Sequence, residues 1–279
     1  MEKFIGFILL IGVIFLIALI GKTPGFNLNL SKPSETPANR TNTNVSGGTR
    51  SVISAPPTNP ATPLNKRVYI GSAYITGYPI QYFQISLYAN LQAGETVDIT
   101  GWQIKANRGN FIIPQAVEFF DPAVAAPSID IILKPNNYVE IYGLASSISR
   151  NFRLNKCFGY LQGIYKFDPP VYTNCPYIFS ADIRYLSGQC QSYIQSLGAC
   201  QIPDVNIYNS FPGTDEGNAC RAFLQNIGYG NCFRSHQNDA DFFSNEWRVW
   251  LNQAQFLDSQ HDYLRLYDNK GNLISEYNY

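Results

Sequence analysis

The sequence predicts an all-β fold, a β-sandwich over residues 67–279, and three features support this. Apolar and polar side chains alternate with period two in many short segments, a pattern typical of half-buried strands. The chain holds 19 tyrosines and 18 phenylalanines but only 14% charged residues, a balance that suits strands better than solvated helices. Clusters of Gly, Pro, Asn and Asp separate the segments at short intervals, as in sandwich folds.

An apolar segment, Phe4–Ile20, lies near the start of the chain and contains no charged residue. As a helix it would span roughly 25 Å at about 1.5 Å per residue, close to the thickness of the hydrocarbon core of a bilayer. We therefore expect residues 1–22 to form a single-pass transmembrane helix that anchors the protein to the cell membrane. A cleaved signal peptide is the alternative, but Ala18–Gly21 lack the pair of small residues that favours cleavage.

Residues 23–66 are rich in Pro, Ser, Thr, Asn and Gly, and their apolar residues are few and scattered. Such a segment cannot bury enough apolar surface to offset the entropy that it would lose on ordering. We therefore expect a disordered linker, with an end-to-end distance on the order of 35 Å for a flexible coil. This linker would hold the folded domain away from the bilayer.

The predicted strands begin at residue 67. In the segment YFQISLYAN, Phe83, Ile85 and Leu87 share one face, and the intervening polar and tyrosine residues share the other. Further strand candidates are ETVDITGWQIKA, GNFIIPQAV, IDIILK, NYVEIYGL, EWRVWL, DYLRLYD and NLISEYNY. A turn that contains Gly271 joins the last two, because glycine readily takes the positive φ that a tight hairpin needs.

The alternation breaks between about residues 157 and 241. Two segments there, CQSYIQSLGAC and CRAFLQNIGYGNC, place apolar residues at helical spacing. Their apolar faces are too small for independent stability, and crosslinks would compensate by restricting the unfolded chain. The sequence therefore predicts a disulfide-rich helical insertion in the sandwich.

All six cysteines of the chain lie in this insertion, namely Cys157, Cys175, Cys190, Cys200, Cys220 and Cys232. An even number in one cluster is typical of a disulfide framework in a secreted domain. Zinc is disfavoured because consecutive cysteines never have the close spacing of zinc ligands. We favour a pairing of Cys157 with Cys175 and leave the other four cysteines unassigned. Because disulfides require an oxidising compartment, we expect this domain to be extracytoplasmic.

Several motifs together resemble the lamin-tail domain in its bacterial secreted form. They are Gly101-Trp102, Leu133-Lys134-Pro135 followed by Tyr138-Val139, and Asp262, Leu264, Leu266, Asp268 and Gly271 in the final hairpin. The resemblance covers about Arg67–Asn155 and Asn245–Tyr279, and it implies an immunoglobulin-like β-sandwich that serves as a binding or structural module without a catalytic centre. The sequence has no coiled-coil rod and no basic localisation segment, so the resemblance does not imply a nuclear filament function. The disulfide-rich insertion lies outside the pattern of the family.

Trp247 and Trp250 are the candidate binding residues. They lie three positions apart in EWRVWL and would face opposite sides of a strand, so one of them should be exposed. An exposed tryptophan beside the insertion could bind a sugar or a peptide, although the insertion could equally well cover it. The tyrosines at positions 69, 74, 78, 82 and 88 form a stripe that is better explained as ordinary strand residues.

The sequence shows no catalytic or cofactor motif. His236 and His261 are its only histidines, and neither has a second metal ligand at zinc-site spacing. The G-x-S-x-G elbow, the glycine-rich phosphate loop and the D-x-D-x-D-G calcium loop do not occur. Asp239 and Asp241, with Glu246 nearby, are better explained as a solvated turn. We therefore predict no enzyme activity, no metal site and no cofactor.

The leading functional hypothesis is a membrane-anchored, extracytoplasmic and non-catalytic binding or adhesion module at the cell surface. Its partners would be envelope glycans or surface proteins, because an aromatic and amide-rich surface suits neutral polar ligands. The formal net charge of zero provides no field to attract nucleic acid. Two alternatives stay open: a structural module of envelope assembly, and a hydrolase whose site in the insertion would use His236, Asp239, Asp241 and Glu246.

Overall fold

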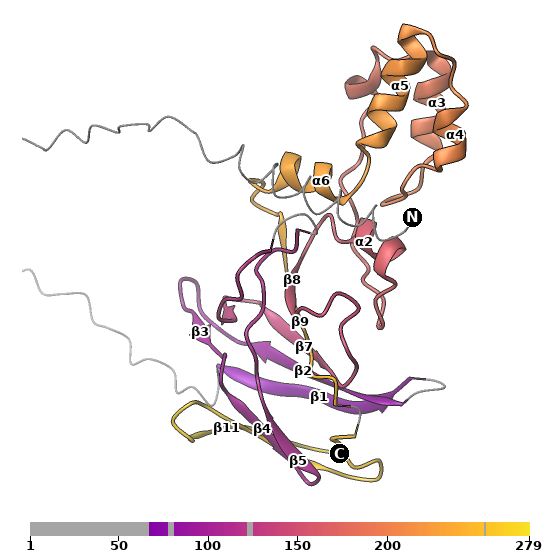
Figure 1. Ribbon diagram of the computed structural model, residues 1–279. Helices are drawn as coiled ribbons and strands as arrows, with labels where there is room; N and C mark the ends of the chain where they lie inside the picture. Colours follow the sequence, from indigo (N-terminus) through magenta and orange to yellow (C-terminus); the bar gives the residue numbers. More distant parts are fainter. Residues whose placement is uncertain (1–66, 78–80, 122–124, 254) are drawn as a thin grey trace, which may run out of the picture. The chain divides into compact units, whose positions relative to one another are not determined.

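The computed structural model describes residues 67–77, 81–121, 125–253 and 255–279 (Figure 1). All of them belong to one compact unit, Thr58–Tyr279. The predicted membrane helix at residues 1–22 and the predicted linker at residues 23–66 lie outside the described residues. Within the described ranges, no helix has both the length and the apolar character that crossing a bilayer requires.

The larger sheet contains five strands in the order β1-β2-β7-β9-β8. Their bounds are Val68–Thr76 for β1, Tyr82–Ala89 for β2, Tyr138–Tyr142 for β7, Phe243–Trp250 for β9 and Phe152–Asn155 for β8. Neighbouring strands are antiparallel except β7 and β9, which run parallel with Val139 opposite Trp247. The five-stranded sheet is therefore mixed.

The second sheet contains four strands in the order β11-β10-β4-β5. The bounds are Leu273–Asn278 for β11, Tyr263–Tyr267 for β10, Gln103–Ala106 for β4 and Gly109–Ile112 for β5. A separate short pair consists of β3, Val97–Asp98, and β6, Ile132–Leu133. The predicted final hairpin is present: Gly271 has a φ of 82°, and the Asp268 carboxylate accepts hydrogen bonds from the backbone N–H groups of Lys270 and Asn272. This turn holds β10 against β11.

Side chains from both sheets form one buried core. Phe83 of β2 is fully buried, and its ring centroid lies 6.1 Å from that of Phe111 and 5.2 Å from that of Phe256. Trp102 and Trp247 belong to the same cluster. At roughly 1.5 to 3 kcal/mol for each fully buried large apolar side chain, this core is a main source of stability.

Helices occupy the chain between β8 and β9. They are α2, Gly159–Tyr165; the 3₁₀-helix η2, Ser180–Ile183; α3, Gly188–Ser196; α4, Val205–Asn209; α5, Asp215–Gln225; and α6, Tyr229–His236. Side chains cap three of the helix starts. Ser187 Oγ accepts a hydrogen bond from Cys190 N, Asp204 Oδ1 accepts one from Asn206 N, and Thr214 Oγ1 accepts one from Gly217 N. Figure 1 shows α3, α4 and α5 lying together. We call residues 156–242 the helical region.

A second buried cluster joins the five-stranded sheet to the helical region. The fully buried ring of Phe152, on β8, lies 4.4 Å from that of Phe158, 5.5 Å from that of Phe167 and 5.0 Å from that of Trp250, measured between centroids. Tyr229 of α6 belongs to this cluster as well. The helical region is therefore packed on the sheet through aromatic side chains.

Three disulfides crosslink the helical region, which confirms the prediction of a disulfide-bonded domain and indicates an oxidising, extracytoplasmic environment. They join Cys157 to Cys232, Cys175 to Cys200 and Cys190 to Cys220. The predicted pairing of Cys157 with Cys175 is wrong. The reason is tertiary: α6 returns to pack near α2, which brings Cys232 to Cys157, and local spacing carries no information about this return.

The prediction of an all-β, immunoglobulin-like sandwich is wrong. The described residues combine a mixed five-stranded sheet and an antiparallel four-stranded sheet with helices. Strands β7 and β9 pair in parallel, which hairpin-linked strands cannot do. Period-two alternation identifies half-buried strands but says nothing about their direction. No membrane-spanning helix occurs in the part of the chain that the structure describes, and the segment predicted to form one lies outside that part.

Candidate functional site

The two tryptophans singled out from the sequence are both buried. Trp247 is 2% exposed in the core between the sheets, and Trp250 is 7% exposed beneath the helical region. Trp250 Nε1 donates a hydrogen bond to the carbonyl oxygen of Asp168 at 3.3 Å. The expectation that one of them is exposed is therefore wrong, because the helical region covers the side of β9 that carries Trp250. Neither ring offers a face to a ligand in this structure.

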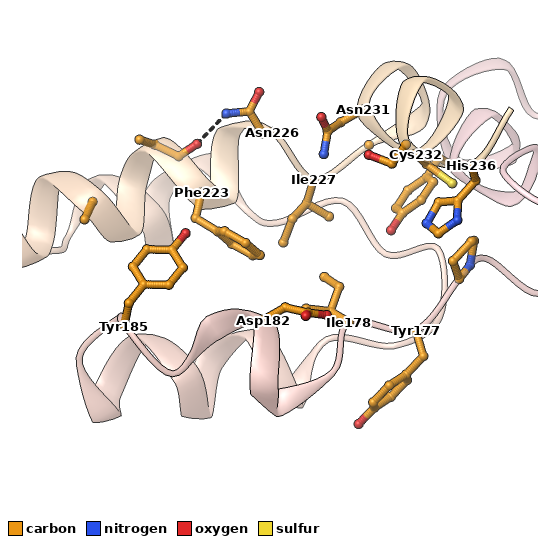
Figure 2. Close-up of a pocket in the computed structure, with 16 residues that line it drawn as sticks. Tyr177, Ile178, Asp182, Tyr185, Phe223, Asn226, Ile227, Asn231, Cys232 and His236 are labelled. Atoms are coloured by element: carbon orange, nitrogen blue, oxygen red, sulfur yellow. Dashed lines mark hydrogen bonds between the residues drawn. The ribbon is translucent and has the colours of Figure 1, made fainter. Parts of the chain in front are cut away.

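The main hollow of the helical region is a groove of about 750 Å³ (Figure 2). One wall comes from the segment around η2 and the other from α5, α6 and the turn between them. Its lining includes Ile178, Asp182, Tyr185, Phe223, Ile227 and Asn231. We call this hollow the groove.

Apolar side chains face each other across the groove. Figure 2 shows Phe223 and Ile227 pointing from the α5 wall toward the wall that carries Tyr185 and Ile178. Tyr185 is 68% exposed, and Phe223 and Ile227 are only partly buried, although Leu224 between them is buried in the α3–α5 core. The groove therefore has an apolar interior that the described residues leave accessible.

Disulfides hold both walls of the groove. Cys232 lines it and is bonded to Cys157, at the end of β8, while Cys175 precedes the η2 wall and is bonded to Cys200. A smaller hollow of about 160 Å³ adjoins the groove and shares Pro176, Ile178 and Ile227 with it. The third disulfide, Cys190–Cys220, ties α5 to α3, which contacts η2. Because this crosslink limits how far the two walls can move apart, the groove is largely preformed.

Polar side chains surround the apolar interior. Asn226 Nδ2 donates a hydrogen bond to the carbonyl oxygen of Ala222 at 2.8 Å, which leaves its side-chain oxygen directed elsewhere (Figure 2). Asp182 and Asn231 also line the groove, and within the described ranges neither side chain has a hydrogen-bond or ion-pair partner. These groups can therefore bond to a ligand without breaking contacts inside the protein.

A charged cluster lies at the end of α6, where His236 lines the groove. His236 Nδ1 lies 2.8 Å from Asp239 Oδ2, and Lys156 Nζ lies 3.0 Å from the same oxygen and also pairs with Asp241. Hydrogen bonds from His236 and then from Lys156 lower the pKa of Asp239, and the bond from Lys156 lowers the pKa of Asp241. The cluster links α6 to the end of β8.

We expect Lys156→Met to raise the pKa of Asp239 toward the ordinary value, because the substitution removes one of the two groups that stabilise its ionised form. Since a lowered pKa adds stability only above the unfolded-state pKa, this contribution should be lost as the pH falls through the lowered folded-state pKa. Carboxyl-carbon NMR titration would measure the shift. Lys105→Met, on β4, is the control and should leave the pKa unchanged; an unchanged value in Lys156→Met as well would contradict the assignment.

The structure brings together three of the four residues of the hydrolase hypothesis. Glu246 lies apart from the others, on β9, where it accepts a hydrogen bond from Tyr138 Oη at 3.0 Å and pairs with Arg248. His236 bonds to Asp239, and Lys156 pairs with both Asp239 and Asp241. Within the described residues, no group of three His, Cys, Asp or Glu side chains is arranged to hold a metal ion.

The groove was not predicted from the sequence. The helical spacing at residues 220–232 marked Phe223 and Ile227 as apolar, but it could not show that packing buries Leu224 and leaves these two accessible. A usable signal was the cluster of aromatic residues Tyr177, Phe179 and Tyr185 in a segment without strand or helix periodicity, all of which are exposed. Exposed aromatic side chains outside regular strands often mark binding sites.

Comparison with known proteins adds no family to this description. No family model matches the chain, and no curated protein or solved structure matches it either. The resemblance to the lamin-tail domain therefore stays a prediction from sequence motifs.

Proposed function

We propose that this protein is an extracytoplasmic, non-catalytic binding module that holds a polypeptide segment of a surface protein in its groove. The observation that carries the proposal is the set of apolar side chains that face each other across the groove, Phe223 and Ile227 opposite Ile178 and Tyr185. A peptide can insert apolar side chains between these walls, whereas a sugar would leave much of this apolar surface uncovered.

The polar groups of the groove suit a peptide that also carries a basic residue. Asp182 has no cationic partner among the described residues, so a lysine or arginine of the ligand would complement its charge. The side-chain amides of Asn226 and Asn231 can bond to peptide N–H and C=O groups. Such contacts would fix the direction of the bound segment.

The disulfides support this proposal through preorganisation. A ligand that enters a preformed groove avoids the entropy loss of ordering its walls, so more of the contact energy appears as affinity. Attachment to a membrane through residues 4–20 stays a prediction from the sequence alone, and binding in the groove does not depend on it.

A peptide-display screen against the full chain, with its disulfides intact, tests the proposal. We expect enriched peptides to combine apolar side chains with a basic residue. Tyr185→Ala and Phe223→Ala should each weaken binding of a selected synthetic peptide by about tenfold, which corresponds to about 1.4 kcal/mol. Because Tyr185 is 68% exposed, its loss should leave the fold intact. Isothermal titration calorimetry would measure both variants.

Tyr88→Ala is the matched control, because Tyr88 is another exposed aromatic residue but lies on the five-stranded sheet. It should bind the selected peptide as the unmodified chain does. A screen without enrichment, or a peptide that binds Tyr185→Ala and Phe223→Ala with unchanged affinity, would overturn the proposal.

A further inference from the structure

Three tyrosine rings lie side by side across three strands of the five-stranded sheet. Tyr69 of β1 is opposite Tyr88 of β2, and Tyr88 is opposite Tyr138 of β7. The ring centroids are 5.8 Å apart in the first pair and 5.9 Å in the second, with interplanar angles of 28° and 27°. Rings at these separations and small angles are offset rather than face to face, so they form a continuous aromatic strip.

Gly71 allows the middle ring to lie against the backbone of β1. A Cβ atom at residue 71 would lie 2.4 Å from two ring carbons of Tyr88, so any other residue would push the ring away. The β1–β2 register is irregular at this position, between Ile70 and Ser72. Because one side of the ring rests on the strand, its other side faces outward, and Tyr69 and Tyr88 remain 42% and 38% exposed.

A hydrogen-bonded polar group lies next to the strip. Ser72 Oγ donates to Ser86 Oγ at 3.0 Å, and Ser86 Oγ donates to Glu140 Oε2 at 2.8 Å. Gln84 Nε2 donates to the same carboxylate oxygen at 2.9 Å. The described residues give Glu140 Oε1 no partner, so this oxygen can accept a hydrogen bond from a ligand. We call these residues, with Tyr69, Tyr74, Tyr88 and Tyr138, the tyrosine face.

The helical region covers only part of this side of the sheet. Tyr82, Tyr142, Phe152 and Trp250 lie in the buried cluster beneath it. The tyrosine face lies on the same side of the same strands, and no described side chain packs over Tyr69, Tyr74 or Tyr88, since each is more than a third exposed. An aromatic and polar surface of this kind is available to a partner.

The charges of the tyrosine face favour an uncharged ligand that carries hydroxyl groups. Arg248 lies opposite Glu140 on the neighbouring strand β9, and it is engaged by Glu246 and by the carbonyl oxygens of Pro169 and Pro170. The face therefore offers no free cation among the described residues, and Glu140 leaves it with an uncompensated carboxylate. An anionic ligand would be repelled, while an apolar one would bury Oε1 of that carboxylate without a hydrogen bond.

We propose that the tyrosine face is a second binding site, which holds a neutral polysaccharide through stacking of sugar rings on the tyrosine strip and a hydroxyl bond to Glu140. The apolar C–H faces of the sugar rings cover the aromatic faces, and the hydroxyl groups at the ring edges supply the donors that Oε1 of Glu140 lacks. This site is separate from the groove in position and in ligand class, and it does not depend on the function proposed for the groove.

Calorimetric titration of the full chain with cellohexaose and chitohexaose tests the site. We expect at least one of these neutral oligosaccharides to bind, and Tyr88→Ala to weaken its binding by about tenfold. Gly71→Ala should weaken it comparably while retaining every tyrosine, because the added methyl group displaces the ring of Tyr88 from the strand. Tyr88→Phe keeps the stacking ring and should bind within about threefold of the unmodified chain, a difference below 1 kcal/mol.

Two controls separate this site from the groove and from general damage to the fold. Tyr185→Ala, in the groove, and Tyr263→Ala, an exposed tyrosine on the four-stranded sheet, should leave oligosaccharide binding unchanged. Circular dichroism checks the fold of each variant, and Tyr69→Ala replaces any strip variant that fails to fold. The proposal is overturned if neither oligosaccharide binds at millimolar concentration, if polygalacturonate binds more tightly than both, or if the folded strip variants bind normally.

Discussion

Replacing Cys157 and Cys232 together with alanine is expected to lower the free energy of unfolding by about 4.5 kcal/mol. The two residues are 75 positions apart, the largest separation among the three disulfides. A crosslink removes more entropy from the unfolded chain when it closes a longer loop, and this one also connects the end of β8 to α6. Urea unfolding of the oxidised double variant, followed by circular dichroism, would measure the loss.

The Cys190–Cys220 disulfide provides the comparison. Its residues are 30 positions apart, and the same loop-entropy relation gives about 3.5 kcal/mol. This bond joins α3 to α5 within a separate buried cluster, so its removal should loosen those helices and leave the two sheets folded. Hydrogen exchange would then be faster in α3 and α5 than in β2. Equal losses of stability and identical exchange patterns in the two double variants would contradict this assignment.

The strand positions could be predicted because burial on one face repeats every two residues. Phe83, Ile85 and Leu87 are each fully buried, as the alternation in β2 requires. The turn at Gly271 was predictable for a similar reason, since a positive φ leaves a signature in the local sequence. These features depend on neighbours in the chain, and a single sequence contains that information.

Features that depend on distant contacts could not be predicted in this way. The parallel pairing of β7 with β9 follows from the route of the helical region between them, and the pairing of Cys157 with Cys232 follows from the return of α6. Trp250 is buried because the helical region covers it, and the alternation along β9 gives no sign of that cover. The predicted fold class was wrong because it depended on these long-range contacts.

The two candidate sites differ in how much of them the sequence revealed. The tyrosines of β1 and β2 were visible as a stripe but were interpreted as ordinary strand residues. Their role as a surface depends on Gly71, which lies below the ring of Tyr88 only after β1 and β2 pair. The groove depends on which side of α5 packs inward, and the helical spacing of Phe223 and Ile227 left that choice open.

Phe152→Ala is expected to lower the free energy of unfolding by about 3 to 5 kcal/mol, the range for large aromatic side chains in a packed core. Phe152 is fully buried, and its ring contacts Phe158 and Phe167 of the helical region as well as Trp250 of β9. Deleting it would remove contacts on both sides of the junction between sheet and helices. Urea unfolding would measure the total loss, and hydrogen exchange of the α2 amides would show where the structure loosens.

Phe83→Ala, in the core between the two sheets, is the matched control for this position. It should cost a similar free energy, because Phe83 is also fully buried and contacts the rings of Phe111 and Phe256. It should not, however, selectively accelerate the hydrogen exchange of the α2 amides, because the contacts of Phe83 lie within the core between the two sheets. Equal changes in the hydrogen exchange of α2 in Phe152→Ala and Phe83→Ala would contradict this assignment. The aromatic cluster would then not be the specific attachment of the helical region to the sheet. The position of the groove would instead depend on the whole core.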